Sequence, residues 1–266
     1  MRGFVVILLY LAAVAASAHA ARRGGGRLAL REPALYLAVA AWLAHAFWLA
    51  NTLRPLGEVV PGLADSASLM GLVIGAGGVF ALFSPAYRTV AAVVLGLAAL
   101  LAAGTGSMPD PREIAEPGWP LAAHILLAMG SAGMFAIAAV LVVLLAVQDG
   151  QLRSKRPANW LASLPPVESL EQALFTVLGT GMAALTVAIL AGLLFVTDLF
   201  QQHLVHKTIL ALTAWLIFAA LLIGRWRFGW RGRKAAAYTI AGFVVLALAY
   251  FGSKFVLEIL LGRHRG

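Results

Sequence analysis

Eight apolar runs, each long enough to cross a lipid bilayer, restrict what this sequence can fold into. A transmembrane helix needs roughly 20 predominantly apolar residues. The runs cover about residues 4–20, 33–52, 67–84, 89–105, 121–147, 172–196, 208–224 and 235–253. The sequence therefore predicts an all-α, polytopic integral membrane protein with eight transmembrane helices, forming a single membrane domain over residues 1–266.

The composition supports this prediction and excludes several classes of chemistry. The chain is 62% hydrophobic and only 12% charged, well outside the range of a soluble domain. It has no cysteine, so disulfides, thiol redox chemistry and covalent haem attachment to this chain through a Cys-x-x-Cys-His motif are excluded. Any bound metal or haem must then be held by histidine, methionine or carboxylate side chains.

The net charge of +9 lies in short loops between the apolar runs. Thirteen lysines and arginines occupy loops 21–32, 85–88, 148–170 and 225–234. Only Arg54, Arg112 and Lys207 occupy the intervening loops 53–66, 106–120 and 197–207. Because cation-rich loops remain in the cytoplasm, this alternation predicts a multi-pass membrane protein with both termini outside. The bilayer is the expected partner of these cations, and we expect no binding to nucleic acid.

A second interpretation of the first apolar run remains open. Ala18, His19 and Ala20 resemble a signal-peptidase site that follows an apolar segment. Cleavage there would invert every later loop and export the five cations of loop 225–234. The charge balance therefore favours a retained first span.

The histidines are the candidate ligands in this topology. Five of the six fall on the outer side: His45, His124, His203, His206 and His264. His203 and His206 would share one face if their segment is helical. Neutral imidazole binds haem iron, zinc and copper, and two such groups above an apolar cleft would suit a b-type haem.

Each histidine also has a structural interpretation. His45 would hydrogen-bond a serine, threonine or carbonyl group of a neighbouring helix, since a polar group at this depth needs a partner. His124 would be an interfacial residue near the headgroups. His203 and His206 would be solvated loop residues, and His264 would be a surface residue of the C-terminal tail. The sequence leaves both interpretations open.

Other chemistries have little support. The sequence has no His-Glu-x-x-His motif, no nucleophile elbow and no phosphate-binding glycine loop. We expect no carboxylate inside spans two to seven, although transporters normally place ionisable groups there. No enzyme class is favoured. A small-molecule or ion transporter, and a membrane scaffold or accessory subunit without ligand chemistry, remain alternatives.

Two local patterns predict packing and a helix start. Gly71 and Gly75 form a small-xxx-small pair that permits close approach of helices. Pro165 and Pro166 break the chain, and Ser169-x-x-Gln172 then resembles a capping box at the start of the sixth span.

An ordered set of segments carries a family resemblance, most clearly over residues 120–255. The segments are Leu164-Pro-Pro-Val-Glu-Ser-Leu-Glu, His206-Lys207, Ala214-Trp215, Gly229-Trp-Arg-Gly-Arg-Lys and Gly242-Phe…Ala249-Tyr-Phe-Gly. The set resembles the cytochrome c assembly membrane protein family (CcsA/ResC-like), and in particular its small HemX/YpjD-like inner-membrane branch.

This resemblance implies a multi-pass protein of the bacterial plasma (inner) membrane that binds or handles haem in c-type cytochrome assembly. It implies haem b as cofactor and other cytochrome c assembly components as partners. By resemblance, His124 matches the family's first outer histidine and is the lead iron ligand. The resemblance also makes His264 a stand-in for the second outer histidine and matches His45 to an intramembrane one. We expect His206 to be the second iron ligand, with His45 and His203 as further candidates for cofactor binding.

The chain departs from the larger relatives in one segment. Where they carry a tryptophan-rich, haem-binding stretch, residues 197–206 read Thr-Asp-Leu-Phe-Gln-Gln-His-Leu-Val-His without a tryptophan. Phe200 and its aliphatic neighbours would then supply the stacking surface, and Lys207 or Arg112 would meet the haem propionates. The departure favours haem binding, relay or an accessory role over full ligation of haem to apocytochrome.

Overall fold

The computed structural model describes residues 2–23, 32–52, 62–103, 118–153, 163–195 and 202–252. Their long helices are α1 (Arg2–Arg23), α2 (Pro33–Thr52), α3 (Leu63–Ala81), α4 (Arg88–Ala102), α5 (Trp119–Arg153), α6 (Val167–Phe195), α7 (Gln202–Phe228) and α8 (Gly232–Ala247). A 3-10 turn, η2 (Pro85–Tyr87), precedes α4, and a π-helical segment, η4 (Leu248–Gly252), continues α8. None of these residues lies in a strand. Eight helical spans are long and apolar enough to cross a membrane, so the predicted eight-helix membrane fold is confirmed.

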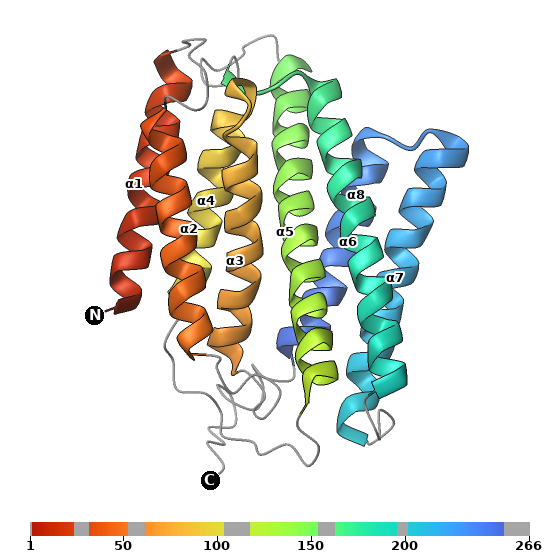
Figure 1. Cartoon of the computed structure of the whole chain (residues 1–266). Coiled ribbons are helices and arrows are strands. Elements are labelled where there is room, and N and C mark those ends of the chain that lie inside the picture. The colour runs from red at the N-terminus through yellow and green to blue at the C-terminus, as the bar shows by residue number, and fades with distance from the viewer. Residues whose placement is uncertain are drawn as a thin grey trace.

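The helices run roughly parallel to one another and alternate in direction (Figure 1). Helix α1 packs against α2 and α4, and α3 packs against α4. Helix α5 packs against α3 on one side and against α6 and α8 on the other. It therefore joins the amino-terminal group of helices to the carboxy-terminal group.

The two ends of the bundle differ in their side chains. We call one the cationic end, at the top of Figure 1; among the described residues it carries Arg22, Arg23, Arg88, Arg153, Arg225, Arg227, Arg231, Arg233 and Lys234. We call the opposite one the histidine end, because α5 begins there before His124 and α7 begins there before His206. That the cationic end faces the cytoplasm remains a prediction from the charge rule.

Several helices extend beyond the apolar runs that predicted them. Helix α5 has 35 residues instead of the 27 of run 121–147. At 1.5 Å per residue it is about 50 Å long, whereas the hydrocarbon core is only about 30 Å thick. Hydropathy marks the part of a helix that lies in lipid, and helical structure continues into the polar layers.

The start of α3 corrects one expectation. This helix begins at Leu63, four residues before the predicted run, and it includes Asp65 in its first turn. The side chain of Asp65 is fully buried. The expectation that spans two to seven hold no carboxylate is therefore wrong for the observed helices: α3 includes Asp65, and the cationic ends of α5 and α6 include Asp149, Glu168 and Glu171.

The predicted capping box of α6 is also wrong. The helix begins at Val167, directly after Pro166, so Ser169 lies inside its first turn. The carbonyl oxygen of Ser169 accepts a hydrogen bond from the hydroxyl group of Tyr87, at 2.9 Å. The two prolines, which cannot continue a preceding helix, define the start of α6.

The small-xxx-small pair is confirmed as a packing device. A Cβ atom on Gly71 would lie 2.8 Å from the Cβ atom of Leu101, so a side chain there would push α4 away. Gly75 leaves room for Tyr10 of α1 and Trp42 of α2. Both glycines let neighbouring helices approach α3.

Candidate functional site

His124 lies in the second turn of α5, at the histidine end, and its ring faces α6. The Nδ1 atom lies 2.8 Å from the carbonyl oxygen of Ala188. A carbonyl oxygen can only accept a hydrogen bond, so Nδ1 carries the proton and donates it. The neutral ring then has its lone pair on Nε2, the form in which imidazole binds a metal.

Gly192 makes this orientation of the ring possible. A Cβ atom at Gly192 would lie 3.0 Å from Cε1 and 3.3 Å from Nδ1 of His124. The ring therefore lies against the bare backbone of α6, one turn beyond Ala188. Within the described part of the chain, no residue is hydrogen-bonded to Nε2 of His124.

An apolar cluster lies beside this histidine. Its buried residues come from α2, α3, α5 and α6 and include Ala188, the residue that accepts the hydrogen bond. They are Leu49, Leu69, Ala128, Met129 and Ala188. The imidazole is thus anchored where four helices meet.

His203 and His206 lie in helix α7, so their predicted place in the loop 197–207 is wrong and the helical condition for a shared face is met. The helix includes both His203 and His206, so they lie one turn apart on the same helix. The side chain of His206 is exposed, whereas that of His203 lies outside the described residues. Among the described residues, no hydrogen bond joins His206 to His124, and no group of three or more histidines and carboxylates could hold a metal ion.

His45 is fully buried in α2, and both of its ring nitrogens are engaged. Nδ1 lies 3.2 Å from the hydroxyl of Tyr10 in α1, and Nε2 lies 2.9 Å from the hydroxyl of Ser68 in α3. The structural interpretation, hydrogen bonding to a neighbouring helix, is therefore confirmed. One of these two bonds would have to break before His45 could bind iron.

Three of the remaining candidates lie outside the described residues, whereas Lys207 and Trp215 lie within them. Arg112, Phe200 and His264 lie outside the described residues. Lys207 is half-buried on α7. Trp215 of the same helix donates a hydrogen bond from Nε1 to the hydroxyl oxygen of Thr186, at 2.9 Å, which links α7 to α6.

Sequence reasoning missed the residues that orient the histidines. Ala188, Gly192, Tyr10 and Ser68 are ordinary members of apolar spans and match no motif. Ala188 is 64 positions from His124, and it contributes only its backbone oxygen. Such a contact follows from the packing of α5 on α6 and has no counterpart in local spacing.

Comparison with known proteins identifies relatives of the chain. The family model for the cytochrome C assembly protein matches residues 4–261. The inner membrane protein YpjD of Escherichia coli (strain K12) is 31% identical over 237 residues, which cover 86% of this chain and 88% of YpjD. The cytochrome c biogenesis protein CcsA of Gloeothece citriformis is 33% identical over 109 residues, 40% of this chain and 33% of CcsA. No solved structure matches the chain.

Proposed function

Because the chain belongs to the cytochrome c assembly protein family, we propose that it is an inner-membrane protein that binds haem, with His124 as an iron ligand. The matching family is described as a cytochrome C assembly protein, and the assembly of a c-type cytochrome implies handling of haem. We further propose that the haem is of the b type, bound without a covalent link. The lack of cysteine in the chain agrees with this proposal.

The hydrogen bond from His124 to Ala188 is the observation that carries the proposal. Haem iron takes a neutral imidazole nitrogen as an axial ligand. Metal-binding histidines usually donate the other N–H to a carbonyl or carboxylate, which fixes the tautomer and makes the free nitrogen more basic. His124 has this arrangement, and the half-buried ring leaves Nε2 without a partner among the described residues.

We propose that His206 would be the second histidine to hold the iron, with His203 as the alternative. Both lie in the first turns of α7, at the same end of the bundle as His124. The side chain of His206 is exposed, so it has room to adopt the rotamer that would direct a ring nitrogen at the iron. His45 remains a reserve candidate, because its two hydrogen bonds compete with iron.

We propose haem handling, either relay or an accessory step of assembly, as the role of the site. The missing tryptophan-rich segment favours this role over ligation of haem to apocytochrome. Other assembly components are the expected partners. The iron would supply any redox chemistry, while His124 would hold it and Lys207 would meet a propionate.

Absorption spectroscopy of the purified full-length protein tests the proposal. Reconstitution with haem should give a Soret band, and His124→Ala should remove most of it. His19→Ala is the matched control, because His19 is exposed at the cationic end of α1 and should leave the band unchanged. A wild-type protein without a Soret band, or an unchanged band in His124→Ala, would refute haem binding through His124.

The buried Asp65 supports ion-coupled transport as a second candidate function. Ionisable residues inside transmembrane helices commonly mark the pathways of ions and protons. Proton uptake into proteoliposomes that survives His124→Ala but is lost in Asp65→Asn would favour transport. Equal proton uptake by Asp65→Asn and wild type would exclude this role of Asp65.

A further inference from the structure

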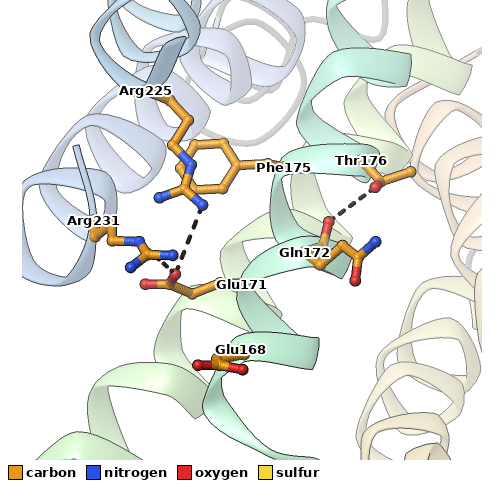
Figure 2. Close-up of a pocket in the computed structure, with 7 residues that line it drawn as sticks. All are labelled: Glu168, Glu171, Gln172, Phe175, Thr176, Arg225 and Arg231. Carbon is orange, nitrogen blue, oxygen red and sulfur yellow. Dashed lines mark hydrogen bonds and ion pairs between the residues drawn. The ribbon is translucent and has the colours of Figure 1, made fainter. Parts of the chain in front are cut away.

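A cleft of about 550 Å³ lies at the cationic end, between α6 and the connection of α7 to α8. Glu171 and Phe175 line it from α6, whereas Arg225 and Arg231 line it from the opposite side (Figure 2). Figure 2 shows both guanidinium groups directed toward the carboxylate of Glu171. The cleft is far from His124, which lies at the other end of the bundle.

Arg225 is held in place by an aromatic ring. Its guanidinium carbon lies 4.5 Å from the centroid of Phe175, a cation–π distance. Its closest approach to the carboxylate of Glu171 is 3.9 Å, which is too long for a hydrogen bond. Arg225 is therefore oriented by Phe175 and keeps N–H donors for another anion.

Arg231 shares the same carboxylate oxygen. Its Nε atom lies 3.1 Å from Oε2 of Glu171, while its side chain is 62% exposed. Glu171, by contrast, is only 13% exposed. One half-buried carboxylate thus faces two guanidinium groups. The other acid of the cleft, Glu168, is exposed on its rim, where solvent screens its charge.

The surrounding side chains place the cleft at the level of the lipid headgroups. Trp226 and Phe228 are 82% and 73% exposed at the end of α7. Exposed aromatic residues at the end of a transmembrane helix mark the membrane–water interface. Three further cations, Arg227, Arg233 and Lys234, are exposed on the same connection and make its charge strongly positive.

We propose that this cleft binds the phosphate of an anionic phospholipid headgroup. Arg225 and Arg231 would be its ligands, because guanidinium groups bind phosphate through paired, charge-assisted hydrogen bonds. Basic pockets between transmembrane helices are known to take such headgroups. Glu171 is then an internal anion that competes with the lipid phosphate for the two arginines. The bound lipid would stabilise the packing of the α7–α8 connection against α6.

Binding to phosphatidylglycerol tests this site in the full-length protein. The thermal unfolding midpoint in neutral detergent should rise with added phosphatidylglycerol and not with phosphatidylcholine. The double variant Arg225→Gln/Arg231→Gln should weaken the apparent affinity about ten-fold or more, since it loses charge-assisted hydrogen bonds. Arg153→Gln is the control, because Arg153 is an exposed cation at the same end, paired with Asp149. Wild-type affinity in the double variant would overturn the proposal.

Glu171→Gln separates a lipid site from a structural ion pair. The substitution keeps the size of the side chain and removes the competing charge. We expect phosphatidylglycerol to bind about two- to five-fold more tightly, the range for a partly exposed charge. An unchanged or weaker affinity would show that Glu171 and the two arginines form only a structural ion pair, which overturns the proposal. This result is decisive even if the double variant fails to fold. A midpoint that rises equally with inorganic phosphate would overturn the lipid assignment in favour of a soluble anion.

Discussion

The Nδ1 atom of His124 and the carbonyl oxygen of Ala188 lie 2.8 Å apart, across the interface of α5 and α6. The histidine is thus oriented by a backbone atom, which no substitution of Ala188 removes directly. The ring also lies against Gly192, where a Cβ atom would come within 3.0 Å of it. Gly192 is therefore the position at which the orientation of His124 can be changed without altering the histidine itself.

Gly192→Ala should weaken haem binding about 10- to 100-fold, the usual effect of disturbing a group that orients a metal ligand. The added methyl group would displace the ring and lengthen its bond to Ala188. Titration of the purified protein with haem, followed at the Soret band, measures the affinity. Gly179→Ala is the matched control on the same helix, because a Cβ atom there meets nothing within 4 Å. Equal affinities in the two variants would contradict the orienting role of Gly192.

Ser68→Ala should lower the free energy of unfolding by about 1–3 kcal/mol, the cost of leaving a buried polar group unsatisfied. The group in question is Nε2 of His45, which lies 2.9 Å from the hydroxyl of Ser68. Unfolding by sodium dodecyl sulfate, followed by circular dichroism, measures the loss. The Soret band of the reconstituted protein should remain. A folded Ser68→Ala variant without that band would instead place His45 in the haem site.

Arg88→Ala should destabilise the protein by about 3–5 kcal/mol, because it leaves one partner of a buried ion pair uncompensated. The Nη2 atom of Arg88 lies 2.9 Å from Oε1 of Glu32, with side chains only 6% and 16% exposed. The same substitution at Arg153, whose exposed pair with Asp149 has the same 2.9 Å length, should cost at most about 1 kcal/mol. Similar unfolding curves for both variants would show that burial does not decide the value of these pairs.

Gly133→Ala should destabilise the interface of α5 and α3 by about 1–3 kcal/mol through overpacking. A Cβ atom there would lie 2.8 Å from Cβ of Val73 and 3.0 Å from the carbonyl oxygen of Met70. Gly130→Ala, one turn away in open space, should be neutral or stabilising, because alanine favours the helix. The two unfolding midpoints measured in one detergent give the comparison; a stabilised Gly133→Ala variant would contradict close packing.

The eight helices could be predicted because a helix that crosses lipid needs a continuous run of apolar residues. The residues at which the helices end could not be predicted, because a helix can continue into the polar layers. Helix α5 does so beyond residue 147, as far as Arg153. Asp65 was missed for the same reason: it lies outside the apolar run and inside the helix. Hydropathy reports the lipid boundary, whereas backbone hydrogen bonds determine where a helix ends.

The site was only partly predictable. The order of the spans predicted that His124 and His206 lie at the same end of the bundle, and the structure confirms this prediction. The two bonds of His45 depend on the rotation of α1, α2 and α3 about their axes, and the spacing of residues within one span does not fix that rotation. The predictions that concern binding by these histidines remain to be tested.

The buried contact of His45 with Tyr10 and Ser68 has a consequence for the order in which the protein is made. Its members lie 35 and 23 positions apart and belong to α1, α2 and α3, which are translated before α5 and α6. The ring of His124, in contrast, is oriented by Ala188 of α6, which is translated 64 positions later. We therefore expect the amino-terminal helices to form an assembled platform during translation, on which the ligand-bearing helices dock afterwards. Crosslinking of Tyr10 to α2 in stalled nascent chains that include α3 would reveal this order.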